Sequence, residues 1–159
     1  MRIGVFSDTH GSLSALEMFR KPLGRLDCIF HLGDFASDAG AIASAFCCPS
    51  YVVRGNCDYG SSAPCELTVE LLGKRFLLTH GHGYWVEHEL IQKAVENGCN
   101  AIFYGHTHIP SLNACGELLL CNPGSLSRPR GGSKRSCALL TLDDDDLYIK
   151  LLSPSSSSL

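Results

Sequence analysis

The sequence predicts an α/β fold, and three observations indicate it. Short apolar runs alternate with helix-like segments through the first third of the chain, an order typical of a parallel sheet with helices on its faces. The composition, 45% hydrophobic and 18% charged residues, is usual for a globular chain. Polar residues follow the apolar runs directly, at the strand ends where such sheets carry their sites.

The first third is expected to form three buried strands, because its apolar runs close in polar, glycine-containing turns. The first helix opens with the Ser14-x-x-Glu17 spacing of a capping box and is expected to end near Pro22. The second helix is rich in alanine. The expected segments are strands at 2–6, 28–32 and 51–53 and helices at 14–21 and 38–46.

The middle of the chain is expected to begin with a β-hairpin, because two alternating runs meet at Leu72-Gly73. A helix follows and stops at Gly98. The last third is expected to be all-β around one long, turn-rich loop. The segments are strands at 66–71, 74–79, 100–104, 118–121, 137–142 and 147–152, a helix at 87–97 and the loop at 122–132.

The chain is expected to form a single domain over residues 1–152, because 159 residues are enough for one full core. A Ser-rich flexible tail is expected at 153–159. The four acids at 143–146 could hold a cation, but a hairpin turn in solvent is favoured because nothing else in the sequence converges on them.

Composition also limits the partners and the compartment. The net charge of −3 favours neither general nucleic-acid binding nor an anionic membrane surface, and no apolar run reaches the ~20 residues of a membrane span. The start of the chain lacks the layout of a secretory signal. The nine cysteines are odd in number and form no C-x-x-C pair. We therefore expect buried, reduced thiols and a cytoplasmic protein.

Ligand-type side chains follow five of the predicted strands. Asp8 and His10 are two residues apart, so an extended backbone would point both to one side. Taken alone, this pair also fits a turn whose aspartate caps backbone amides. Repetition of the pattern favours a metal site. The other strand-end residues are Asp34, Asn56, His80, His106 and His108.

The number of ligands points to two metal ions, because seven oxygen and nitrogen donors exceed the needs of one. A shared carboxylate can hold two ions ~3.5–4 Å apart, the spacing used in phosphoryl hydrolysis. The set contains no thiolate, which favours Mn, Fe or catalytic Zn over a structural zinc site.

In their order along the chain, these motifs resemble the signature of calcineurin-like metallophosphoesterases. The small size and the Gly-Asn-Cys-Asp form of the third motif are similar to the small YfcE-like phosphodiesterase branch. The resemblance implies a four-layer α-β-β-α sandwich of mixed sheets. The motifs are Asp8-x-His10, Gly33-Asp34, Gly55-Asn56-x-Asp58, His80-Gly81-His82 and Gly105-His106-x-His108.

The resemblance also implies a role for each residue. Family members commonly hold Mn, with Ni, Fe or Zn also found. His82 would touch a ligand or the substrate, and Asp58 would orient its neighbours. The implied ligands are Asp8, His10 and His108 for one ion, Asn56, His80 and His106 for the other, and Asp34 as the bridge.

The implied reaction is hydrolysis of a small phosphodiester by a hydroxide that bridges the two ions, without a protein nucleophile. Cys57 stands where many larger relatives carry a histidine that protonates the leaving group. A thiol of pKa ~8.5 is a poorer proton donor there than an imidazole of pKa ~6.5. We therefore expect acidic leaving groups to be favoured.

Two alternatives stay open. A phosphomonoesterase of the same superfamily would need extra cationic contacts, for which Arg128 and Arg130 are candidates. A non-catalytic scaffold, like the retromer-coat subunit that shares this fold, would have lost part of the metal set, whereas all seven positions are kept here. The sequence leaves homo-oligomerisation open.

Overall fold

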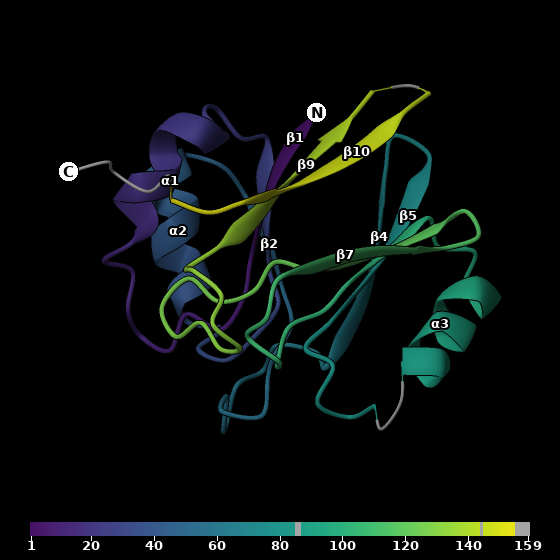
Figure 1. Cartoon of the computed structure of the whole chain (residues 1–159), viewed down its shortest axis with the longest axis horizontal. Coiled ribbons are helices and arrows are strands. Elements are labelled where there is room, and N and C mark those ends of the chain that lie inside the picture. Colours follow the sequence, from purple (N-terminus) through teal and green to yellow (C-terminus); the bar gives the residue numbers. More distant parts are fainter. Residues whose placement is uncertain (85–86, 144, 155–159) are drawn as a thin grey trace.

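The first of two five-stranded sheets is built around the N-terminal strand. The computed structural model describes residues 1–84, 87–143 and 145–154. Within this sheet the strands lie in the order β10-β9-β1-β2-β3, and Figure 1 shows β9 and β10 as a hairpin beside β1. The first three strands along the chain run parallel, and the last two pair antiparallel beside β1. The strands are β1 (Arg2–Phe6), β2 (Cys28–His31), β3 (Ser50–Val52), β9 (Cys137–Leu142) and β10 (Leu147–Leu152).

The second sheet has the order β4-β5-β6-β8-β7 and is also mixed. Strands β5, β6 and β8 run parallel, whereas β4 and β7 are antiparallel edge strands. Its strands are β4 (Glu66–Leu71), β5 (Lys74–Thr79), β6 (Ala101–Phe103), β7 (Ser111–Cys115) and β8 (Leu118–Asn122).

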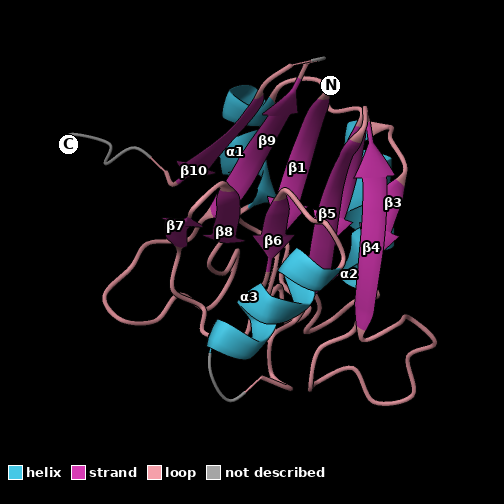
Figure 2. Ribbon diagram, turned by 90° about the vertical axis from the view of Figure 1, so that its right-hand side faces the viewer, coloured by secondary structure: helices cyan, strands magenta, loops and turns pink. Residues whose placement is uncertain are grey.

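The helices cover the outer faces of the sandwich. Helices α1 (Leu16–Leu23) and α2 (Asp38–Phe46) bury their apolar sides against the first sheet, and α3 (Glu87–Glu96) lies on the second. Figure 2 shows α3 in front of the second sheet, with α1 and α2 on the far side of the sandwich. The expected four-layer α-β-β-α architecture is confirmed.

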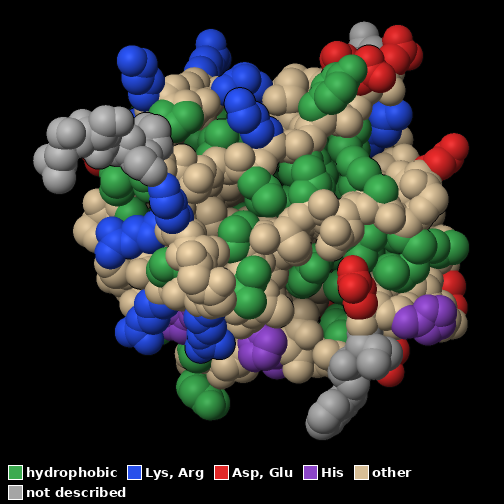
Figure 3. All heavy atoms as spheres, viewed as in Figure 1, with side chains coloured by type: hydrophobic (Ala, Val, Ile, Leu, Met, Phe, Trp, Pro, Cys, Tyr) green, Lys and Arg blue, Asp and Glu red, His purple; other side chains and the backbone are tan. Residues whose placement is uncertain are grey.

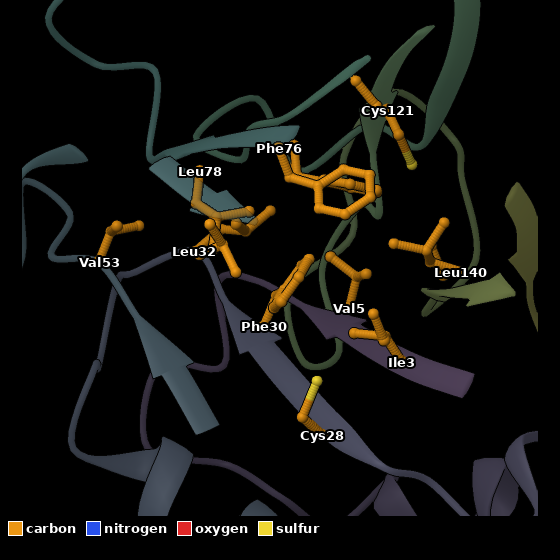
Figure 4. Close-up of a cluster of buried hydrophobic side chains, with 14 of the residues drawn as sticks. Ile3, Val5, Cys28, Phe30, Leu32, Val53, Phe76, Leu78, Cys121 and Leu140 are labelled. Atoms are coloured by element: carbon orange, nitrogen blue, oxygen red, sulfur yellow. The ribbon is translucent and has the colours of Figure 1, made fainter. Parts of the chain in front are cut away.

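An apolar core fills the space between the two sheets (Figure 4). Alternate residues of each strand point inward, as the pleat requires. Phe30 lies at the centre, with its ring 6.1 Å from that of Phe76 and 5.7 Å from that of Phe103. All three side chains are fully buried. This packing holds the sheets face to face and aligns their strand ends.

Three local predictions need correction. Strand β7 was not expected, because its five residues are mostly exposed and only weakly apolar. The capping box does not form: Ala15 occupies the N-cap and no side chain caps the helix. Pro22 lies inside α1 rather than beyond it. It does so near the C-terminal end of the helix, where the missing N–H removes a single bond.

The prediction for the cysteines is only partly right. Cys28, Cys121 and Cys137 are buried, as expected, but Cys47, Cys57, Cys65 and Cys115 are exposed. All nine are free thiols.

The prediction for the acidic segment can be compared with the structure, whereas most of the predicted C-terminal tail cannot. The described acids of the segment between β9 and β10 form the hairpin turn that was favoured, with the Asp146 N–H donating to Asp143 Oδ1 at 2.7 Å, and Asp144 lies outside the described residues. Residues 155–159 of the expected tail lie outside the described residues. Across the described part of the chain, none of the helices has the length and apolar character needed to cross a membrane.

Candidate metal centre

The seven predicted ligands all lie at one end of the sandwich, in the loops that follow the strands. The first sheet supplies Asp8, His10, Asp34 and Asn56, and the second supplies the three histidines after β5 and β6. Figure 3 shows histidine side chains along the lower edge of the molecule, close to a group of Lys and Arg side chains. The ligand set therefore spans both sheets.

The backbone at this edge is not extended, which corrects the argument that placed Asp8 and His10 on one side. Their φ angles are 53° and 45°, and those of His106 and His108 are 69° and 61°. Asp34 has a φ of 55°. Non-glycine residues rarely adopt this left-handed region. The side chains converge because each loop turns sharply at the strand end.

The first group of donors is tightly packed. Asp8, His10, Asp34 and His108 each offer one ligand atom, and these atoms lie within 4.8 Å of one another. His108 Nε2 lies 3.0 Å from Asp8 Oδ1 and 3.3 Å from His10 Nε2. His10 Nε2 lies 3.6 Å from Asp34 Oδ2. A carboxylate and imidazole set of this kind suits a first-row divalent metal.

A second group of donors lies on the other side of Asp34. His80 Nε2 is 3.4 Å from Asp34 Oδ1, whereas His10 faces the other oxygen of the same carboxylate. His106 Nδ1 is 3.0 Å from Asn56 Oδ1. The ring centroids of His80 and His106 are 5.3 Å apart. One carboxylate thus presents an oxygen to each donor group, as a bridging ligand would.

Two buried polar atoms show that a cation fits this site. Among the described residues, Asp8 Oδ1 and His80 Nε2 have no hydrogen-bond partner, and buried polar groups rarely lack one. His80 Nδ1 donates to Leu32 O at 2.7 Å and His108 Nδ1 donates to Arg128 O at 2.6 Å. With Nδ1 as the donor, each ring directs the lone pair of its Nε2 toward the other candidate ligands, the usual arrangement of metal-binding histidines.

The pKa shifts agree with a site built for positive ions. Burial raises the pKa of Asp8 to about 7 and lowers that of His80 to about 4. Burial also lowers the pKa of His10, His106 and His108. The histidines are therefore neutral at pH 7, the protonation state that binds a metal.

Asp34 is shifted in the opposite direction from Asp8. Burial alone would raise its pKa, but the Cys57 N–H, which donates to Asp34 Oδ1 at 2.9 Å, and the neighbouring His80 ring outweigh burial and lower it. Asp34 is thus held in the ionised form that a bridging ligand requires.

Asp58 holds the Asp34 loop in place, as the sequence motif implied. Its two oxygens accept hydrogen bonds from the backbone N–H groups of Asp34, Phe35, Ala36 and Gly55, at 2.7–2.9 Å. The carboxylate is fully used in these bonds. Asp58 therefore orients the loop that carries Asp34 rather than facing an ion.

The hydrogen bonds of two supporting residues were not predicted from the sequence, although Ser125 was expected to lie near the site. Ser125 Oγ donates to Asp8 O at 2.8 Å, from the long loop between β8 and β9. His31 is fully buried; its Nδ1 accepts from the Gly33 N–H at 3.3 Å, and its Nε2 lies 3.1 Å from Thr9 Oγ1. No short motif marks these contacts, which join residues far apart in the chain. His31 directly before the Leu-Gly-Asp turn was the one available signal.

Gly105, in the loop after β6, packs directly against the loop after β1. A Cβ there would lie 2.0 Å from Ser7 Oγ and 2.8 Å from Asp8 Oδ2. Glycine is therefore required in the loop that carries His106, because any side chain would push the second sheet away from Asp8.

His82 and Cys57 lie at the rim of the centre. His82 is exposed, and its ring centroid is 5.4 Å from that of His80. A hollow of about 380 Å³ beside it is lined partly by His82, Asn56 and Tyr59. Cys57 is exposed, and partial burial and the neighbouring Asp34 raise the pKa of its thiol. Both side chains are exposed at this rim, whereas Asp8, His80 and His108 are buried.

Comparison with known proteins agrees with this geometry. The calcineurin-like phosphoesterase superfamily domain matches residues 1–145. The chain belongs to the calcineurin-like phosphoesterase superfamily. The probable metallophosphoesterase YsnB of Bacillus subtilis is 31% identical, over 94% of this chain and 89% of the relative. Phosphodiesterase YfcE of Escherichia coli is 32% identical, over 98% and 95%.

A solved structure extends the comparison of folds. Vps29 of Entamoeba histolytica, determined with Zn²⁺, superposes with a TM-score of 0.84, covering 99% of this chain and 95% of that one. Its sequence is 20% identical, so the likeness concerns the fold alone. The membership of the superfamily supports hydrolysis of phosphoric esters and binding of divalent metal.

Proposed function

We propose that this protein is a phosphodiesterase that hydrolyses small phosphodiesters by direct attack of hydroxide. It would hold two divalent metal ions, with Mn favoured over Ni, Fe or Zn. One observation carries the proposal: Asp34 faces His10 with one oxygen and His80 with the other. Phosphodiesterase YfcE, similar over nearly the whole chain, supports the reaction class.

The chain would hold one ion with Asp8, His10 and His108 and the other with Asn56, His80 and His106, sharing Asp34. When bound, two such ions lower the pKa of water and neutralise charge on phosphate oxygens. The chain itself fixes the ligand atoms, through the bonds from His80 to Leu32 and from His108 to Arg128.

The leaving group is expected to depart with little help from a protein acid. The Cys57 thiol has a raised pKa, so it stays protonated at neutral pH, but it donates a proton weakly. A series of aryl and alkyl diesters should therefore show rates that rise steeply as the leaving-group pKa falls. A flat series, with chemistry shown to be rate-limiting, would contradict this part of the proposal.

The deciding experiment is hydrolysis of bis(p-nitrophenyl) phosphate by metal-stripped protein titrated with Mn. Activity is expected to saturate at about two Mn per chain and to fall at least ~10³-fold in Asp34→Asn and His106→Ala, because each change removes a ligand. His88→Ala, an exposed histidine of α3, is the matched control and should keep full activity.

Other results would select the alternatives. A higher kcat/KM on p-nitrophenyl phosphate than on the diester would identify a phosphomonoesterase. Protein that binds no Mn, Ni, Fe or Zn in the titration would exclude both enzymes. The scaffold would then be pursued, on the strength of the fold shared with Vps29.

A further inference from the structure

Two exposed arginines beside the candidate metal centre have no role in the function proposed above. Arg128 and Arg130 lie in the long loop between β8 and β9, and both side chains are exposed. Among the described residues neither guanidinium contacts a carboxylate; the arginine ion pairs are those of Arg20 and Arg75, elsewhere on the surface. Within the described part of the chain, neither arginine therefore forms an ion pair with an acidic side chain.

The loop is fastened to the metal ligands, so the positions of these arginines are fixed relative to the site. His108 Nδ1 donates to Arg128 O at 2.6 Å, and the Arg130 N–H donates to His108 O at 3.3 Å. The Arg128 N–H donates to Ser125 Oγ at 2.8 Å, and that hydroxyl donates to Asp8 O at 2.8 Å. The backbone of each arginine is therefore joined to the predicted ligand His108 by a hydrogen bond.

The charges of the two side chains also affect the pKa values of two candidate ligands. Burial is the main cause of the lowered pKa of His10 and His108, and the positive charges of Arg128 and Arg130 lower both further. The hydrogen bonds of the loop to His108 therefore bring both positive charges close to the candidate metal centre.

A count of charges indicates what these arginines are for. Two divalent ions carry four positive charges, and the carboxylates of Asp8 and Asp34 cancel two of them. A hydroxide and a phosphodiester, with one negative charge each, cancel the other two. The metal-bound diester therefore needs no further cation, whereas a phosphomonoester group carries about −1.5 to −2 at pH 7 and matches two arginines.

We propose that Arg128 and Arg130 form a second phosphate-binding position, and that the preferred substrates are small phosphodiesters that also carry a phosphomonoester group. The proposal rests on the function proposed above, because it takes the scissile diester to lie at the metal centre. The arginines then select substrates by a group that is not cleaved.

The kinetic test uses two substrates with the same scissile bond. Thymidine 5′-(p-nitrophenyl phosphate) is compared with its 3′-phosphorylated form, and the ratio of their kcat/KM values is measured. We expect the 3′-phosphate to raise kcat/KM at least ~10-fold in the native protein, as a pair of charge-assisted contacts would. The ratio should fall to about one in the double variant Arg128→Ala/Arg130→Ala.

Arg135→Ala is the control, because it removes one arginine charge from another exposed position of the same loop. It should retain the native ratio. A ratio near one in the native protein, or an equal loss in Arg135→Ala, would overturn the proposal. Since these variants alter exposed side chains, circular dichroism should show unchanged folding.

A binding measurement separates this proposal from the phosphodiesterase itself. Calorimetry compares thymidine 3′,5′-bisphosphate with thymidine 5′-monophosphate on the Mn-loaded protein. We expect at least ~10-fold tighter binding of the bisphosphate, lost in the double variant. Equal affinities together with hydrolysis of bis(p-nitrophenyl) phosphate would overturn the arginine position and leave the phosphodiesterase standing. Absence of that hydrolysis would instead count against the phosphodiesterase, whatever the nucleotides do.

Discussion

The middle of the sandwich and its ligand-bearing edge are built in opposite ways. In the middle, regular strands bury Phe30, Phe76 and Phe103 against one another. At the edge, Asp8 and Asp34 are buried in left-handed backbone conformations, and Asp8 Oδ1 has no hydrogen-bond partner among the described residues. We infer that the middle contributes most of the free energy of unfolding. The edge lowers that free energy, because its candidate ligands are buried in positions that suit a metal ion better than the metal-free fold.

The largest effect is expected from Phe30→Ala in the middle. Removing this ring leaves a cavity between the sheets and should lower the free energy of unfolding by about 4 kcal/mol. Urea denaturation measures this loss, and metal analysis of the folded variant should still give the native stoichiometry. A variant of native stability that has lost its metal would contradict the division between the two regions.

His31, between the two regions, should make stability depend on pH by up to about 3 kcal/mol. Burial lowers its pKa to about 4, against ~6.5 in an unfolded chain. Below pH 6.5 the unfolded state therefore takes up a proton that the folded state refuses until about pH 4, and stability falls across this window.

The test compares the pH dependence of stability in the native protein and in His31→Gln, whose side chain does not titrate. Urea midpoints between pH 7.5 and 4 should fall more steeply in the native protein than in the variant. If the two proteins showed the same pH dependence, the pKa of His31 would be the same in the folded and unfolded states, which would contradict this prediction.

At the edge itself, Asp58→Asn should cost about 2 kcal/mol and weaken metal binding by roughly 10–100-fold. The amide cannot accept hydrogen bonds with its nitrogen, so two of the four backbone N–H groups lose their acceptor. Asp143→Asn, in the distant hairpin turn where the carboxylate also accepts backbone N–H groups, should not change the metal affinity. Equal metal affinity in both variants, by calorimetry, would show that Asp58 does not support the ligands.

The smallest effect has the opposite sign. Metal-free Asp8→Asn should be about 1 kcal/mol more stable than the native protein at pH 8. Burial raises the Asp8 pKa to about 7, so the ionised carboxylate destabilises the fold above that pH. The advantage should shrink as the pH falls towards 4, where both states carry the proton. A less stable variant at pH 8 would show that the edge is not under strain.

The sequence predicted the two regions with different success. The apolar runs predict buried strands that carry Phe30 and Phe76, and all four residues of β2 are buried. The ligands could be predicted because polar residues interrupt apolar runs at each strand end. Their convergence could not be derived from an extended strand, since Asp8 and His10 have positive φ. The bonds from Ser125 to Asp8 and from His31 to Thr9 join distant residues, and local pattern carries no information about them.

The division of the ligands between two sheets also has a kinetic consequence. Asp8 and Asp34 follow strands of one sheet, and His80 and His108 follow strands of the other. The full donor set therefore exists only after the sheets have docked, late in folding. An ion bound there would lengthen the lifetime of the native state by slowing unfolding, while the rate at which the chain folds would stay almost the same.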